Sequence, residues 1–337
     1  MKFSSAEFAL RWVVLALAGL VVPVVACAEV TSINIGRSYS LGQLPAIIME
    51  KYKLIEKHAA AGGIPDLKVQ WHTFAGAAAE NDALLSGSVH FTLNGVPGLL
   101  ILWDKTQGQV RGVAACDAES MFLNTRNPNV RSIADFTDKD KIAVPAVRVS
   151  VTAIQLQMAA AKTFGEKDLR RLDPFTVSLS NPDGMAAILA NTEVNSHFTV
   201  EPYSARELKV TGVHTVLRSD DTLGGQGTLN VFIATEKFRA ENPKVYHAFV
   251  QALKEADEMI NRDKKAATEA YIETAKGFSF DEIHSVIDQK KIQFSMAPVQ
   301  TMKYAEFLHR IGTIKTMPKS WKDYFFQDPE IAKLSGS

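Results

Sequence analysis

The chain has 337 residues, of which 46% are hydrophobic and 22% are charged, and this length predicts about two domains. Its 37 basic and 37 acidic side chains give a formal net charge of zero. Because a neutral chain has no long-range field to hold a polyanion, the composition argues against nucleic-acid binding as the main role. Two cysteines are too few for a disulfide framework or a zinc cluster built from thiolates.

The N-terminus has the pattern of a secretory signal peptide. Lys2 and Arg11 precede an uncharged apolar stretch over 12–22, and small residues at Ala26 and Ala28 fit the rule for signal cleavage. The apolar run is shorter than the roughly 20 residues that a membrane-spanning helix needs. We therefore predict export to the periplasm, with cleavage after Ala28.

A second interpretation of the same segment concerns Cys27. The sequence Val-Val-Ala-Cys over 24–27 resembles a bacterial lipobox, in which Cys27 would be lipidated and would anchor the mature protein to a membrane. With residues 1–28 removed as a signal peptide, Cys116 is the only cysteine left. An exported protein with one thiol cannot form an internal disulfide, so its core alone must stabilise it.

The first part of the mature chain alternates predicted strands and helices. Polar and apolar periodicity predicts strands over 30–36, 67–74, 89–93 and 110–116, and helices over 44–55 and 77–85. Strands that alternate with helices over short connections predict a parallel or mostly parallel sheet covered by helices.

A second α/β set follows, and the last quarter of the chain is helical. Strands are predicted over 121–124, 141–144, 194–198, 214–217 and 229–234, and helices over 151–161 and 181–190. After residue 242 four helices are predicted, over 243–261, over 264–276, after a capping box of Ser279 and Glu282, and from Pro298 to Ile311.

These elements predict a mixed α/β protein of two lobes joined by a two-segment hinge. The apolar strand over 229–234 returns the chain to the first sheet, and the C-terminal helices need that lobe to cover their apolar faces. We predict a discontinuous lobe 1 over 29–117 and 226–337, and a lobe 2 over 118–225. Two lobes with two crossovers form a hinge over a cleft.

Motifs for catalysis are missing from the sequence. There is no G-x-S-x-G elbow, P-loop, H-E-x-x-H or G-x-G-x-x-G, and the eight histidines have no metal-ligand spacing. Cys116 ends an apolar strand, which is typical of a buried, inert thiol. We predict a protein that is not an enzyme and has no metal or cofactor.

Small or polar residues recur just after the strands, where helices begin. In open α/β sheets, ligands bind outside the carboxyl ends of the strands, and helix N-termini there offer N–H groups and partial positive charge to an anion. One such segment alone indicates only a cap or a turn, but their repetition in both lobes predicts a binding site. The segments are 39–40, 76–78, 94–97, 149–152 and 197–199.

At these segments the chain resembles the substrate-binding proteins of ABC importers in the nitrate/sulfonate/taurine (NitT/TauT) and thiamine-precursor group. The resemblance lies in 43–45, 74–76, 83–88, 94–97, 132–136, 141–145 and 193–202, and the run from Ala143 to Ser150 is its most specific part. It implies a periplasmic binding protein of type II with ligand-contacting loops at Ser40, Gly76, Ala77, Asn94, Val96, Ser150, Val151 and His197.

One departure from the family pattern affects the expected pocket. Many members carry an acidic residue where this chain has Asn195-Ser196-His197-Phe198. His197 is a candidate donor to a carboxylate or sulfonate, and Tyr39 and Phe198 are candidates to pack against the organic part of a solute.

The resemblance implies the substrate-binding component of an ABC importer that captures a small organic anion, of the sulfonate or carboxylate class. Its partners would be the transmembrane permease subunits with their ATPase, with no nucleic acid, and the protein would act as a monomer. Two alternatives stay open: a sensor that presents its closed form to a receptor, and a binding protein or synthase-like enzyme for a thiamine-pyrimidine precursor on the same fold.

Overall fold

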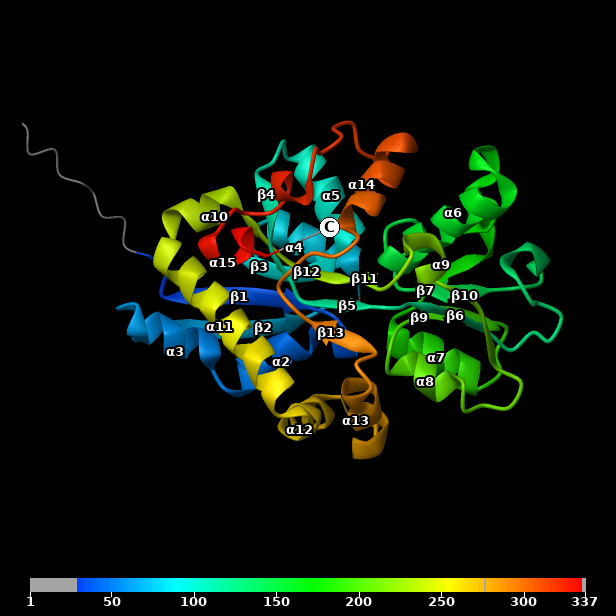
Figure 1. The fold of residues 1–337 in the computed structure, drawn as a ribbon, viewed down its shortest axis with the longest axis horizontal. Helices are drawn as coiled ribbons and strands as arrows, with labels where there is room; N and C mark the ends of the chain where they lie inside the picture. Colours follow the sequence, from blue (N-terminus) through cyan, green and yellow to red (C-terminus); the bar gives the residue numbers. More distant parts are fainter. Residues whose placement is uncertain (1–28, 75, 276, 335–337) are drawn as a thin grey trace, which may run out of the picture.

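The computed structural model describes residues 29–74, 76–275 and 277–334. The predicted signal peptide, its cleavage site and the alternative lipidation at Cys27 lie outside these residues. The described chain forms two α/β lobes side by side, and strands of both lobes run roughly along the horizontal long axis of the view in Figure 1.

The first sheet has the strand order β2-β1-β3-β12-β4. In this sheet β1 is parallel to both of its neighbours, β2 and β3, whereas β12 is antiparallel to its neighbours, β3 and β4. The sheet is thus mostly parallel on its N-terminal side and gains an antiparallel strand when the chain returns. The bounds are β1 (Ser32–Arg37), β2 (Lys68–Thr73), β3 (Phe91–Gly95), β4 (Val110–Ala115) and β12 (Asn230–Thr235). We call this sheet and the helices packed on it lobe 1.

Helices cover lobe 1 between its strands. The segment predicted as one helix over 44–55 is divided into α2 and α3, because Lys53 adopts a left-handed conformation with φ of 50°. Aromatic side chains fill the core between sheet and helices: Phe91 stacks on Phe249 with ring centroids 3.9 Å apart. The N-terminal helices are η1 (Leu41–Gln43), α2 (Leu44–Lys51), α3 (Leu54–Ala61), α4 (Ala77–Leu85) and α5 (Val96–Lys105).

The second sheet has the strand order β10-β6-β9-β7-β8, and with its helices it forms lobe 2. Its strands are β6 (Phe122–Thr125), β7 (Ile142–Val144), β8 (Thr176–Ser178), β9 (Ser196–Thr199) and β10 (His214–Arg218). Its helices are α6 (Val151–Phe164), α7 (Asn181–Leu189), α8 (Tyr203–Glu207) and α9 (Asp220–Leu223). The start of α7 matches the prediction, with Ser180 rather than Asn181 as its N-cap.

A small third sheet links the two lobes. In it β5 (Asp117–Glu119) pairs antiparallel with β11 (Gly227–Thr228) and with β13 (Ile292–Phe294). The chain leaves lobe 1 through β5 and returns through β11, so these two strands are the crossovers. The domain boundaries near 117 and 226 fall at this sheet, and the division of the chain there stays a prediction.

The C-terminal part is helical and packs on lobe 1, where α11 contacts α2 and α3 and α14 contacts α5. The predicted capping box of Ser279 and Glu282 is present at the start of α13. The last predicted helix begins at Thr301 and not at Pro298, after Gln300 in a left-handed conformation. The bounds are α10 (Glu236–Glu241), α11 (Pro243–Arg262), α12 (Lys264–Thr274), α13 (Phe280–Asp288), α14 (Thr301–Arg310) and α15 (Pro329–Ala332). Within the described ranges, no helix has the length and apolarity to cross a membrane.

Candidate functional site: a cavity between the lobes

A cavity of about 80 Å³ lies between the two lobes. Both lobes line it, together with Leu229, which follows β11, and Asn230, the first residue of β12. Lobe 1 contributes Ser38, Tyr39, Ser40, Gly76, Glu80, Asn94 and Gly95, and lobe 2 contributes Pro145, Ser150, Val151, Thr152, Ser180, Asn181 and Val200.

Four helices begin at this cavity. The N-caps of α4 and α5 in lobe 1 are Gly76 and Gly95, and those of α6 and α7 in lobe 2 are Ser150 and Ser180, and all four N-caps line the cavity. Each helix N-terminus leaves backbone N–H groups without an intrahelical partner and carries a partial positive charge. The cavity therefore has the electrostatic character of an anion site, although no basic side chain builds it.

The lobes touch at the rim of the cavity. The Asn181 amide nitrogen of lobe 2 donates a hydrogen bond to the Tyr39 carbonyl oxygen of lobe 1 at 3.2 Å. Gly95 packs so closely on Val151 that a Cβ at position 95 would overlap the Val151 Cγ2. A Cβ on Gly76 would lie 3.2 Å from the Pro145 carbonyl oxygen. These contacts join residues far apart in the chain, and they connect lobe 1 to lobe 2 beside the cavity.

Glu80 is the one acidic side chain of the cavity lining. It lies one turn into α4, is 1% exposed, and its Oε1 has no hydrogen-bond partner within the described part of the chain. Burial without compensation raises the pKa of this carboxyl to about 8. Among the lining residues there is no Lys, Arg or His, and Tyr39 is the other ionisable group.

Six of the predicted site residues line the cavity, and they come from four of the five predicted segments. They are Tyr39, Ser40, Gly76, Asn94, Ser150 and Val151. Ala77 is the first residue of α4, directly after Gly76. The structure brings these segments together, and whether they contact a solute stays a prediction.

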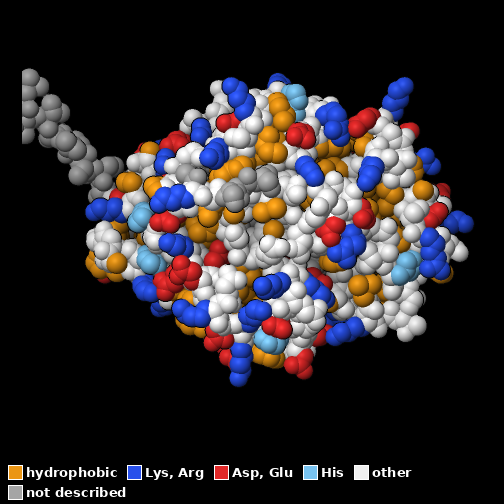
Figure 2. All heavy atoms as spheres, in the orientation of Figure 1, with side chains coloured by type: hydrophobic (Ala, Val, Ile, Leu, Met, Phe, Trp, Pro, Cys, Tyr) orange, Lys and Arg blue, Asp and Glu red, His pale blue; other side chains and the backbone are white. Residues whose placement is uncertain are grey.

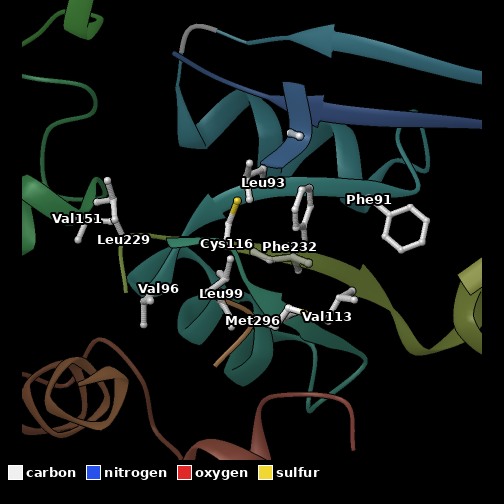
Figure 3. Close-up of a cluster of buried hydrophobic side chains, with 14 of the residues drawn as sticks. Phe91, Leu93, Val96, Leu99, Val113, Cys116, Val151, Leu229, Phe232 and Met296 are labelled. Carbon is white, nitrogen blue, oxygen red and sulfur yellow. The ribbon is translucent and has the colours of Figure 1, made fainter. Parts of the chain in front are cut away.

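Val96 belongs to the core and not to the cavity. It is the first residue of α5 and is completely buried, in the same apolar cluster as Leu93 and Leu99 (Figure 3). Its side chain points into lobe 1 because the helix starting there must bury its apolar face on the sheet. The prediction that Val96 contacts a ligand is wrong for the side chain.

His197 and Phe198 also lie outside the cavity, so their prediction as cavity residues is wrong. Both are fully buried in β9, which pairs with β6 on one side and β7 on the other. The His197 Nδ1 lies 2.6 Å from Glu207 Oε1, and the other Glu207 oxygen accepts a hydrogen bond from Asn124. The chain reaches the cavity one residue after this strand, at Val200, so the end of β9 faces the cavity while His197 and Phe198 stay in the interior of lobe 2.

The sequence reasoning missed Glu80, Asn181 and Asn230, the first residue of β12. Asn181 was recognised as the start of a helix but was not assigned to the site. Glu80 lies four residues after Gly76 and so on the same helix face as the predicted loop, a spacing that could have identified it. Within the described ranges, no group of three or more His, Cys, Asp or Glu side chains is placed to hold a metal ion.

Sequence comparison identifies the family. Residues 26–275, about three quarters of the chain, match the model of the NMT1-like family. The chain belongs to the NMT1-like family. No functionally curated protein matches this member in sequence.

Solved structures share the fold of this NMT1-like protein at low sequence identity. The alkanesulfonate-binding protein SsuA of Xanthomonas axonopodis pv. citri, bound to MOPS, has a TM-score of 0.65 at 15% identity, over 87% of this chain and 96% of its own. The nitrate-binding protein NrtA of Synechocystis has a TM-score of 0.65 at 16% identity, over 88% and 84%. A Candida albicans protein, described as having the generic periplasmic binding protein fold, has a TM-score of 0.66 at 12% identity, over 91% and 99%. The expected periplasmic binding protein fold is thus confirmed.

Proposed function

We propose that this NMT1-like protein is the solute-binding component of an ABC importer, and that it closes on a small organic anion held between its lobes. The observation that carries the proposal is the convergence of four helix N-termini, two from each lobe, on one cavity. Only the closed arrangement presents all four to one solute, so a solute that contacts them all shifts the population toward the closed form.

The anionic class of solute is supported by the donors that the backbone supplies. Unpaired N–H groups at helix N-termini bind carboxylate, sulfonate or nitrate oxygens without a charged side chain. The outer surface does not contribute a field: basic and acidic side chains are interspersed over the face shown in Figure 2, and the formal net charge is zero. Selectivity for an anion would therefore come from the cavity itself.

The location and partners follow from this role. The protein would act as a monomer outside the cytoplasm and would deliver its solute to a transmembrane permease with its ATPase. The sulfonate-binding and nitrate-binding proteins of the same fold support a solute-binding role. The residues of this chain's own cavity would set which solute it binds. Permease and ATPase genes beside this gene would support import, whereas an adjacent receptor-kinase gene would support the sensor alternative.

A thermal-shift experiment tests the proposal. Purified mature protein is heated with millimolar acetate, propanoate, alkanesulfonates, nitrate and an aminopyrimidine. A binder present at about 100 times its Kd should stabilise the protein by about 2.7 kcal/mol and raise Tm. A rise with at least one anion supports the proposal. A rise with the aminopyrimidine alone would favour the thiamine-precursor alternative, and no rise with any anion contradicts an anion-binding role.

A further inference from the structure

The linking sheet between the lobes buries a pair of acidic side chains. Asp117 and Glu119 lie two residues apart on β5, so their side chains are on the same face of the strand, and they are 1% and 0% exposed. Asp117 Oδ1 accepts hydrogen bonds from the Asn230 backbone and side-chain nitrogens at 2.9 and 3.0 Å. Asp117 Oδ2 and both Glu119 oxygens have no donor within the described part of the chain.

These three oxygens lack the proton that would join the two carboxyls. Burial raises the pKa of Asp117 to about 7, and burial together with the charge of Asp117 raises the pKa of Glu119 well above its usual range. Two ionised carboxylates held together repel each other, whereas a proton on one of them makes it a hydrogen-bond donor to the other. The arrangement of the lobes in the structure therefore favours a protonated pair near neutral pH.

Lobe 2 brings a third acid to this pair. Glu201, in the segment after β9, is 3% exposed, and its charge adds to burial and Asp117 in raising the pKa of Glu119. The same residue is attached to lobe 1. Its carbonyl oxygen accepts the Leu41 N–H at 3.5 Å, and its carboxylate lies 3.7 Å from the Lys291 ammonium group. Rotation of lobe 2 away from lobe 1 would remove Glu201 from the pair and admit water to β5.

The other titratable groups around the pair and Glu201 are acids, phenols and a thiol, and none of these groups carries positive charge. They are Asp257 on α11, Tyr271 on α12, Tyr203 and Glu207 on α8, and Cys116. Lys291 is paired with Glu201, and its side chain is 40% exposed, so its charge is partly screened by solvent. A fully ionised pair would thus destabilise this arrangement of the lobes.

We propose that Asp117 and Glu119 form a proton-linked hinge: the pair takes up one proton when lobe 2 closes and brings Glu201 against it, and releases that proton when the lobes open. The closed form binds the proton and the open form, with water at β5, does not, so a rise in pH favours opening and a fall favours closure. A solute that binds the closed form is then held less tightly as pH rises. The hinge acts whichever solute occupies the cavity, so the inference goes beyond the proposed function.

A disulfide across the cavity measures closure without a solute. A Cβ at position 95 would lie 3.6 Å from the Val151 Cβ, which is within the range of about 3.5–4.5 Å found in disulfides. Gly95 has φ of −78°, a conformation that cysteine adopts. The double variant Gly95→Cys/Val151→Cys is equilibrated with reduced and oxidised glutathione, and the effective concentration of its two thiols rises with the closed population. Cys116 is buried and is present in every protein compared.

The pH dependence of this effective concentration tests the proposal. Between pH 6 and pH 8 we expect a fall of about tenfold relative to the same cysteine pair with Glu119→Gln added, because the glutamine amide donates to Asp117 without an added proton. The comparison cancels the ordinary pH dependence of thiol exchange, since both proteins carry the same cysteines. Glu193→Gln, at an exposed position of lobe 2, is the matched control and should leave the fall unchanged.

The outcomes decide the inference separately from the proposed function. An equal pH dependence with and without Glu119→Gln overturns it, and so does a failure of the disulfide to form at any pH. If Glu119→Gln does not fold, Glu201→Gln makes the same comparison: the fall should become smaller, and an unchanged fall means that closure is not linked to this pair. Because no solute is added, a negative result leaves the solute-binding role standing, and a protein that binds no anion can still show the linkage.

Discussion

Both lobes direct helix N-termini at the same cavity, but the N-cap residues of these helices differ between the lobes. In lobe 2 the N-cap serines accept hydrogen bonds from their own helices: Ser150 from the Ala153 N–H and Ser180 from the Asp183 N–H, both at 3.3 Å. In lobe 1 the N-caps are Gly76 and Gly95, which have no side chain to cap their helices, although the Asn94 side-chain oxygen accepts a hydrogen bond from the Gly95 N–H at 2.6 Å. Lobe 1 thus keeps more of its N–H groups for a solute, whereas lobe 2 uses part of its own to stabilise itself.

The two lobes also differ in whether their buried ionisable side chains are paired. Lobe 2 buries a paired set, His197 against Glu207, which stabilises its sheet and helices. Lobe 1 and its crossover bury carboxyls that lack a cation: Glu80 at the cavity, and Asp117 and Glu119 in the linking strand β5. The buried carboxyls without a cation thus lie in lobe 1 and its crossover, whereas the buried histidine–glutamate pair lies within lobe 2.

The largest expected effect is on the stability of lobe 2. His197→Ala removes the ring that is hydrogen-bonded to the buried Glu207 and leaves a cavity, and these two losses together should cost about 3–5 kcal/mol. Denaturant unfolding should show this loss, while the Kd of any bound solute changes little. His72→Ala, at an exposed position of β2, is the control and should cost under about 0.5 kcal/mol. A large loss of affinity with unchanged stability would return His197 to the binding site.

The next effect is on closure between the lobes. Gly95 has φ of −78°, so alanine suits its backbone, but the added Cβ would overlap Val151 across the cleft. Overpacking of about 1–3 kcal/mol in the closed form alone predicts an affinity loss of about 5- to 150-fold, with little change in Tm without solute. Calorimetry and X-ray scattering with and without solute measure this. Gly62→Ala, on the surface of lobe 1, is the matched control, and equal affinity for both variants would mean that closure does not bring these residues together.

The buried acids of β5 predict a dependence of stability on pH. Burial raises the pKa of Asp117 to about 7, and burial together with the charge of Asp117 raises that of Glu119 well above its usual range. The folded state therefore holds protons that the unfolded chain has released above about pH 4, so these groups destabilise the fold as pH rises from about 4 through 7.

Asp117→Asn tests this pH dependence. Asparagine can still accept the hydrogen bonds from the Asn230 backbone and side-chain nitrogens, and it cannot ionise. The variant should be more stable than wild type at pH 8, by about 2 kcal/mol, and should show a smaller fall in stability between pH 5 and pH 8. Urea unfolding across this range measures both, and an unchanged slope would mean that Asp117 does not titrate with folding.

Local signals predicted most elements of the fold, and tertiary contacts decided what they could not. The helix over 77–85 was predicted with its observed bounds because its start and its closing Ser86-Gly87 are local. The orientation of β9 could not be predicted, because four consecutive buried residues give no alternation to show which side faces the cleft. Glu80 was missed since an acidic residue in the first turn of a helix is common for reasons of helix stability alone.

The smallest expected effect compares two serines of the cavity, one from each lobe. Ser150→Ala removes a cap and should cost about 1 kcal/mol of stability, because the Ala153 N–H loses its acceptor. Ser40→Ala removes a hydroxyl that has no partner in the described chain, so stability should change little while solute affinity falls. Parallel unfolding and binding measurements on the two variants separate the roles of the lobes. If Ser40→Ala costs as much stability as Ser150→Ala and leaves the affinity unchanged, lobe 1 is not the half that reserves its polar groups for the solute.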